Sequence, residues 1–198
     1  LAGFALLRGE LAEATMHLQE VVRLLPKEAV VRLTQVRQRL GQAYLGLGDL
    51  QAARANLELT LASEPERAST LELLATAYSR LGMYRDAATM CERLSRVLTE
   101  PARKAEALFR QGEILRTSLG DPEGASEAYL RASDHDPGYA PPLARLVSYY
   151  WGRAELVKLA DVGGDLVQAS PTPKVDQSDL GLLVTIAALL GHHDEALA

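Results

Sequence analysis

Apolar, small and polar positions along this chain recur at a fixed interval. The stretch 34–67 can be laid over the stretch 68–101 without a gap, a period of 34 residues. The coinciding positions are Leu40 with Leu74, Gly41 with Ala75, Tyr44 with Tyr78, Gly48 with Gly82, Leu50 with Tyr84, and Ala53 with Ala87. A repeat of this length and pattern predicts an array of helix–turn–helix units, each of which buries its apolar face against its neighbours.

Small residues and helix breakers indicate how each unit is built. Close approach of the paired helices requires small side chains, because larger ones would overpack the contact, and we expect this at Gly41, Ala75, Ala53 and Ala87. Turns with a positive φ favour glycine, and we expect them at Gly48, Gly82 and Gly120. Asp49 and Asp121 follow two of these glycines as candidate helix caps. The second helices are expected to end at prolines, namely Pro26, Pro65, Pro137 and Pro171.

The same residues resemble a known family. Leu40-Gly41-x-x-Tyr44, followed by Gly48-x-Leu50-x-x-Ala53 and then by Leu57, Thr60 and Pro65, resembles the tetratricopeptide repeat (TPR). The resemblance implies an all-α fold, a right-handed α-solenoid of about five TPR-like copies. The copies are expected at about 1–28 (partial), 34–67, 68–101, 105–139, 140–173 (degenerate) and 177–198 (partial), together a single solenoid over 1–198.

Two copies depart from the regular pattern. The third carries one extra residue in its first turn, and the fourth has Gly163-Gly164 where its second helix should be strongest. Both ends of the chain fall inside repeats: Gly9-x-Leu11-x-x-Ala14 matches the second half of a repeat whose first helix is mostly missing, and Gly191-x-His193-x-x-Ala196 opens the second helix of a last repeat. We therefore expect a fragment of a longer protein. The stretch Gln168–Asp179 is the most loop-like.

Charge and hydropathy narrow the classes of partner. The net charge of −5 offers no basic face for nucleic acid and disfavours anionic membrane surfaces. The longest apolar run, Leu180–Leu190, is too short to insert across a bilayer, which takes about 20 residues. Arginine outnumbers lysine, which favours a bacterial source with a GC-rich genome. A cytoplasmic location is favoured, and a periplasmic one stays open.

No catalytic motif is present, so we expect no enzyme activity, no cofactor and no metal. The single cysteine, Cys91, is expected to be a small buried apolar residue. His192-His193-Asp194 is interpreted as part of a repeat, because adjacent helical histidines point apart, and Asp134-His135-Asp136 is interpreted as a helix end before Pro137.

The TPR resemblance also implies a binding surface, because the first helices of that family line a concave groove. The implied groove residues here are Arg80, Phe109, Arg110, Glu113, Arg116, Arg145 and Trp151. Arginines could bind a partner's carboxylates with paired hydrogen bonds, and the aromatic residues could supply buried area. The alternative is structural: arginines balanced by neighbouring glutamates on a solvated face, and aromatic rings packed within the repeats.

The function implied is a protein–protein interaction scaffold or adaptor that binds a peptide or partner helix in its concave groove. Three alternatives remain open. The chain could be a regulatory or targeting arm of a multidomain enzyme whose catalytic part is absent. It could self-associate, for example as a homodimer through apolar array ends at Leu1–Leu7 and Leu183–Leu190. It could also be a peptide-sensing regulator whose superhelix changes when ligand binds.

Overall fold

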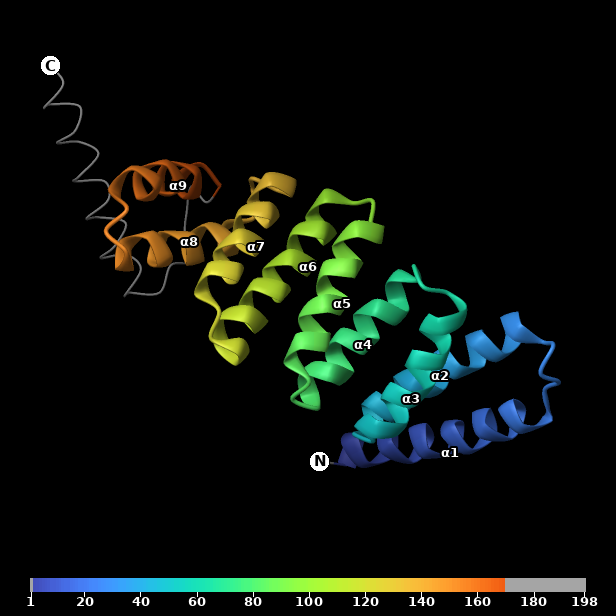
Figure 1. The fold of residues 1–198 in the computed structure, drawn as a ribbon. Coiled ribbons are helices and arrows are strands. Elements are labelled where there is room, and N and C mark those ends of the chain that lie inside the picture. The colour runs from blue at the N-terminus through green and yellow to red at the C-terminus, as the bar shows by residue number, and fades with distance from the viewer. Residues whose placement is uncertain (1, 170–198) are drawn as a thin grey trace, which may run out of the picture. The chain divides into compact units, whose positions relative to one another are not determined.

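The computed structural model describes residues 2–169, and this part of the chain is helical with no strand (Figure 1). The chain divides into two compact units between Leu98 and Thr99. The first contains α1 (Ala2–Leu24), α2 (Val30–Leu47), α3 (Leu50–Ser63), α4 (Ala68–Arg80) and α5 (Tyr84–Val97). The second contains α6 (Pro101–Ile114), the π-helical turn η1 (Leu115–Leu119), α7 (Pro122–His135), α8 (Ala140–Gly152) and α9 (Leu156–Ala169).

Within each unit, the helices pack mainly against their neighbours in the chain. In the first unit α1 packs on α2, α2 on α3, α3 on α4 and α4 on α5, and in the second α6 packs on α7, α7 on α8 and α8 on α9. Packing between sequence neighbours is the arrangement expected of repeat proteins. The expected all-α architecture of paired helices is therefore confirmed for the described residues.

Small residues lie where the paired helices touch, as the sequence predicts. Ala53, Ala75 and Ala87 are completely buried. A Cβ atom at Gly41 would lie 2.5 Å from Cγ of Leu57 on the neighbouring helix, a distance that real Cβ atoms do not reach. Glycine at this position therefore sets how closely α2 and α3 approach.

Glycines and aspartates shape the turns between paired helices. Gly48, Gly82 and Gly120 adopt positive φ angles of 84°, 76° and 64°. The Asp49 carboxylate accepts a hydrogen bond from the backbone N–H of Ala52 at 3.1 Å, and Asp121 caps α7 in the same way. Both kinds of turn residue are therefore confirmed.

The turn between α8 and α9 uses an alanine in the corresponding place. Ala154 has a φ of 56°, in the left-handed region that an L-residue enters only at a cost in energy. Helix α9 then continues through Gly163-Gly164 to Ala169 without a break. The degenerate fourth copy therefore keeps its second helix.

Two local expectations differ in part from the structure. The residues before Gly9 were expected to belong to a preceding helix, but they are part of α1, which runs unbroken from Ala2 to Leu24 because one glycine in a helix costs only about 1 kcal/mol. Gln168 and Ala169, the first residues of the expected loop Gln168–Asp179, are the last described residues of α9. The remainder of that stretch and His192-His193-Asp194 lie outside the described residues.

The extra residue of the third copy is absorbed by a π-helical turn. Gly112 lies one residue farther from its turn glycine, Gly120, than Ala75 does from Gly82. The chain accommodates this residue in η1, where the backbone widens before the N–H of Asp121 donates to the carbonyl of Leu115 at 2.9 Å. The next helix therefore starts in register with its partner.

Candidate functional site

The carboxylate of Glu113, in the last turn of α6, binds side chains from three other elements of the second unit. Arg116 in η1 donates from Nη2 to Oε2 at 3.0 Å, and from Nε to Oε1 at 3.2 Å. Arg145 on α8 donates from Nε to Oε1 at 3.0 Å and from Nη2 to Oε2 at 3.4 Å. The hydroxyl of Tyr129 on α7 donates to Oε1 at 2.5 Å. We call these four side chains the Glu113 cluster.

The cluster holds Glu113 in its ionised form. Burial alone would raise the pKa of the Glu113 carboxyl, but the hydrogen bonds from Arg116 and Tyr129 and the charge of Arg145 outweigh it and lower that pKa. Burial, together with the hydrogen bond to Glu113, raises the pKa of Tyr129 to about 12, so its hydroxyl stays a donor. Two guanidinium groups thus share one carboxylate, and the cluster carries a surplus positive charge.

Phe109 and Trp151 have different environments. The Phe109 ring is half-buried and packs against Tyr129 and Tyr139, with ring centroids 5.7 Å apart in both pairs. The Trp151 side chain, in the last turn of α8, is 42% exposed. Phe109 therefore contributes to packing within the second unit, whereas Trp151 presents apolar area to solvent.

The remaining arginines of the expected groove are placed differently. Arg80 belongs to the first unit, where its Nη1 donates to the backbone carbonyl of Leu45 at 2.8 Å, near the end of α2. A cation at that end also complements the helix dipole. Arg110 lies half-buried on α6, one turn before Glu113. The structure thus brings together Glu113, Arg116 and Arg145, while Arg80 is used in local structure.

Sequence reasoning missed the part played by Tyr129. A comparable contact occurs in the first unit, where the Tyr78 hydroxyl donates to Glu58 at 2.9 Å. In each unit a mostly buried tyrosine keeps its hydroxyl satisfied by a glutamate from the helix it packs against. The recurrence of tyrosine in the repeats indicates that these side chains have a structural role. The repeat period does not predict which glutamate accepts the hydrogen bond from each tyrosine.

We also searched residues 2–169 for a reactive cysteine, a metal site and a membrane-spanning helix. Cys91 is completely buried, as expected. In this range no three His, Cys, Asp or Glu side chains are grouped as ligands for a metal ion. None of the described helices combines the length and the apolar character needed to cross a bilayer.

The fold is that of a repeat protein built from helix pairs. Comparison with known proteins identifies which repeat family the chain resembles. Residues 34–66 match the family model described as tetratricopeptide repeat. No curated protein matches the chain by sequence. The TPR resemblance is thus confirmed, by sequence in that repeat and by fold in the solved structures described next.

Three solved structures illustrate the fold similarity. A crystal structure of MamA has a TM-score of 0.65 at 18% identity, covering 82% of this chain and 90% of that one. PilF of Pseudomonas aeruginosa has a TM-score of 0.60 at 14% identity, covering 98% and 89%. YrrB, described as a TPR protein with an unusual peptide-binding site, has a TM-score of 0.57 at 15% identity, covering 82% and 80%.

Proposed function

We propose that this chain is a protein-interaction scaffold, and that its second unit binds a carboxylate-bearing segment of a partner protein. The observation that carries the proposal is the unequal charge of the Glu113 cluster, in which Arg116 and Arg145 share one carboxylate. Each guanidinium has five N–H donors, and Glu113 takes two from each arginine. The remaining donors can bind a second carboxylate, that of a partner.

The cluster is accessible and its arginines are already oriented. The side chains of Arg116 and Arg145 are 42% and 45% exposed, although both are held by Glu113. Paired hydrogen bonds between an arginine and a carboxylate are stronger than bonds between neutral groups. Because Glu113 fixes both guanidinium planes, a partner would lose less side-chain entropy on binding there than at mobile arginines.

Trp151 provides the apolar part of the proposed surface. It lies on α8, the helix that also carries Arg145, and a Trp anchor commonly accounts for about 2 kcal/mol or more of binding free energy. The peptide-binding site named for YrrB, a TPR protein of similar fold, supports a peptide as the partner. The proposed role is binding without chemistry, in which Arg110 and Phe109 border the surface and support it.

The experiment is a comparison of partner capture by matched variants. The chain is used as bait in a lysate beside Arg145→Gln/Trp151→Ala, which leaves the bond between Arg116 and Glu113 intact. The control is Arg96→Gln, because Arg96 is an exposed arginine paired with one glutamate in the first unit. Captured proteins are identified by mass spectrometry, and their acidic segments are synthesised and titrated by fluorescence anisotropy.

The proposal expects a partner that is retained by the wild type and by Arg96→Gln but not by the double variant. The affinity of its acidic segment should fall as salt is raised from low to physiological concentration, because exposed charges are screened. Equal retention by all three baits, or a captured segment without acidic residues, would contradict the proposal.

Self-association is a second candidate function, favoured by exposed apolar side chains in the first unit. Those on α1 and the start of α2 are Met16, Val21, Leu24, Val30 and Val31, each 40% or more exposed. The side chains of Leu1–Leu7 and Leu183–Leu190, where we expected a homodimer contact, lie outside the described residues. Sedimentation of the wild type and Leu24→Asp/Val31→Asp over a dilution series tests this. A concentration-dependent dimer lost in the variant would support it.

A further inference from the structure

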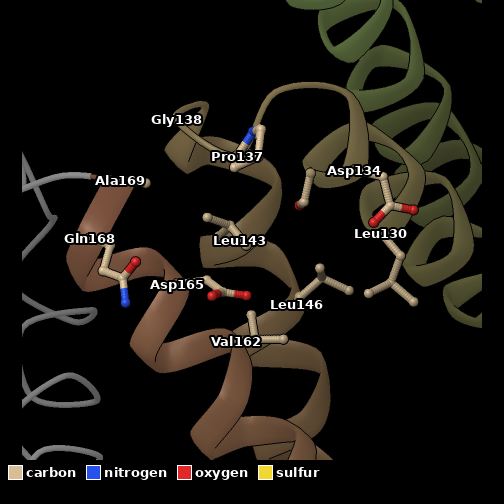
Figure 2. Close-up of a pocket in the computed structure, with 11 residues that line it drawn as sticks. Leu130, Asp134, Pro137, Gly138, Leu143, Leu146, Val162, Asp165, Gln168 and Ala169 are labelled. Carbon is tan, nitrogen blue, oxygen red and sulfur yellow. The ribbon is translucent and has the colours of Figure 1, made fainter.

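A pocket of about 590 Å³ lies between α7, α8 and α9, and it is separate from the Glu113 cluster. Figure 2 shows its three walls, with Leu143 and Leu146 of α8 between side chains of α7 and side chains of α9. The volume falls within the range of about 300–1,000 Å³ that is usual for ligand pockets in proteins. The pocket is therefore large enough for a side chain of a partner.

Apolar side chains form the base of the pocket and part of its walls. Leu143, Leu146 and Val162 are almost completely buried, and Leu130 on the α7 wall is 39% exposed. An apolar wall that stays partly exposed gains free energy when a partner covers it, in proportion to the area removed from water. The occupant should therefore bring apolar atoms.

Each helical wall adds a carboxylate one turn after its apolar residue. Asp134 follows Leu130 on α7, and Asp165 follows Val162 on α9, with both aspartates exposed and on the pocket lining. Neither carboxylate forms an ion pair with another residue of the described part of the chain. Among residues 2–169, no lysine or arginine lines the pocket, so the charged side chains that these residues contribute are all negative.

Asp134 is placed where an anion is unfavourable. It lies in the last turn of α7, which ends at His135, and the free carbonyls there give that end a partial negative charge. A cation bound at the pocket would interact favourably with the helix end and with both carboxylates. The neighbouring Asp136 is already used, because its Oδ1 accepts a hydrogen bond from the N–H of Gly138 at 3.1 Å.

We propose that this pocket is a second docking site, and that its occupant is a partner segment in which a lysine or arginine is flanked by leucine-like residues. The apolar side chain contacts Leu130, Leu143 and Val162, and the cation lies between Asp134 and Asp165. This occupant has the opposite charge to the one proposed for the Glu113 cluster. The second unit therefore offers two surfaces of opposite charge preference, as an adaptor joining two partners requires.

The test is a titration of the ¹⁵N-labelled chain with three synthetic nonapeptides, followed by two-dimensional NMR. The first peptide alternates leucine and arginine, the second leucine and glutamate, and the third serine and arginine. The proposal expects the leucine–arginine peptide to bind most tightly and to shift the backbone resonances of Leu130, Gly138 and Asp165. Tighter binding of the leucine–glutamate peptide at these pocket residues, or leucine–arginine shifts confined to other residues, would overturn it, whereas binding of the leucine–glutamate peptide at the Glu113 cluster belongs to the other proposed surface.

Isosteric variants separate the pocket from the rest of the surface. Asp134→Asn and Asp165→Asn should each weaken binding of the leucine–arginine peptide about two- to fivefold, the range of partly exposed ion pairs. The matched control is Asp161→Asn, one turn earlier on α9 and outside the lining. Unchanged spectra of the free variants would show that they fold. The variant Asp134→Asn/Asp165→Asn combines both changes. Equal affinities of the wild type, the control and this double variant for the leucine–arginine peptide would overturn the proposal.

Discussion

Arg145 on α8 binds Glu113 on α6 through two hydrogen bonds, Nε to Oε1 at 3.0 Å and Nη2 to Oε2 at 3.4 Å. The same carboxylate accepts bonds from Arg116 and Tyr129, so one side chain connects η1, α7 and α8. Glu113 therefore has two consequences: it stabilises the second unit, and it orients the arginines proposed to bind a partner.

Glu113→Gln should remove a contribution to stability that depends on pH. Although burial raises the pKa of Glu113, the bonds from Arg116 and Tyr129 and the charge of Arg145 bring it below its ordinary value. A depressed folded-state pKa stabilises the fold above the unfolded-state pKa of about 4.3, and this stabilisation is lost as the pH falls through the folded-state pKa. Melting curves should therefore separate wild type from Glu113→Gln at neutral pH and converge below about pH 4.

The control for this measurement is Glu127→Gln, an exposed position on α7. It should melt with the wild type at neutral and at acidic pH, since it replaces a solvated side chain. A gap between wild type and Glu113→Gln that stays constant across the pH range would mean that the shape of the side chain, and not its charge, supports the unit.

The π-helical turn should tolerate the loss of one residue. Deleting Ser118 shortens the spacing from Gly112 to Gly120 by one residue, so that it equals the spacing from Ala75 to Gly82 in the second copy. The residues of η1 can then continue α6 as an ordinary α-helix. We expect a change in unfolding free energy within about 1 kcal/mol, since α-helical geometry replaces a π turn. Thermal unfolding followed by circular dichroism measures it.

Deleting Thr76 from α4, before the buried Ala77 and Tyr78, provides the contrast. That helix has no extra residue, so the deletion would turn every later side chain of α4 by about 100° and misalign these two residues with the partner helix. Unfolding of the first unit is expected. Similar melting temperatures for the two deletions would mean that the extra residue of the third copy is not what η1 accommodates.

The sequence predicts features that depend on neighbours along the chain, and it misses those that depend on stacking. Gly48 and Asp49 were identified correctly because a turn and a cap involve only a few adjacent residues. Arg80 was expected to face a partner, yet it donates to the carbonyl of Leu45, 35 residues earlier. The repeat period predicts which face of a helix a residue occupies. It does not predict which hydrogen-bond acceptor a long side chain such as that of Arg80 will reach.

The Glu113 cluster shows the same limit. Its arginines and its glutamate were all candidates from the sequence, with local balance by glutamates as the alternative. In the structure, Glu113 pairs with both Arg116 and Arg145. The pair with Arg145 forms only because α6 and α8 lie at a suitable distance, which the sequence does not reveal. The pocket between α7 and α9 was not expected at all, since its lining comes from residues that no motif connects.

Ala154→Gly should stabilise the second unit. Ala154 has a φ of 56°, and an L-residue in this region loses about 1–2 kcal/mol relative to its preferred conformations. Glycine removes that cost but adds unfolded-state entropy, so the net gain should be about 0.5–1 kcal/mol. Trp151, the only tryptophan, lies three residues before Ala154, so its fluorescence during urea unfolding reports on this unit.

The reciprocal change is Gly82→Ala in the first unit. Gly82 has a φ of 76°, and no atom lies within 4 Å of the position that a Cβ would take, so only the backbone conformation opposes the substitution. It should destabilise by about 1 kcal/mol. If Ala154→Gly lowered the urea midpoint instead, the turn before α9 would depend on the Ala154 side chain and not on its backbone.

Ala87→Leu should destabilise the first unit by about 1–3 kcal/mol, the usual cost of forcing a larger side chain into a well-packed contact. Ala87 is completely buried on α5, and α4 packs directly against that helix. The matched control is Ala55→Leu, the same substitution at an exposed position of α3. Thermal unfolding followed by circular dichroism should show a lower midpoint for Ala87→Leu and little change for Ala55→Leu. Equal midpoints would show that the helices of a pair can separate to admit the extra methyl groups, and that the small residues at their contact do not set the spacing of the repeat.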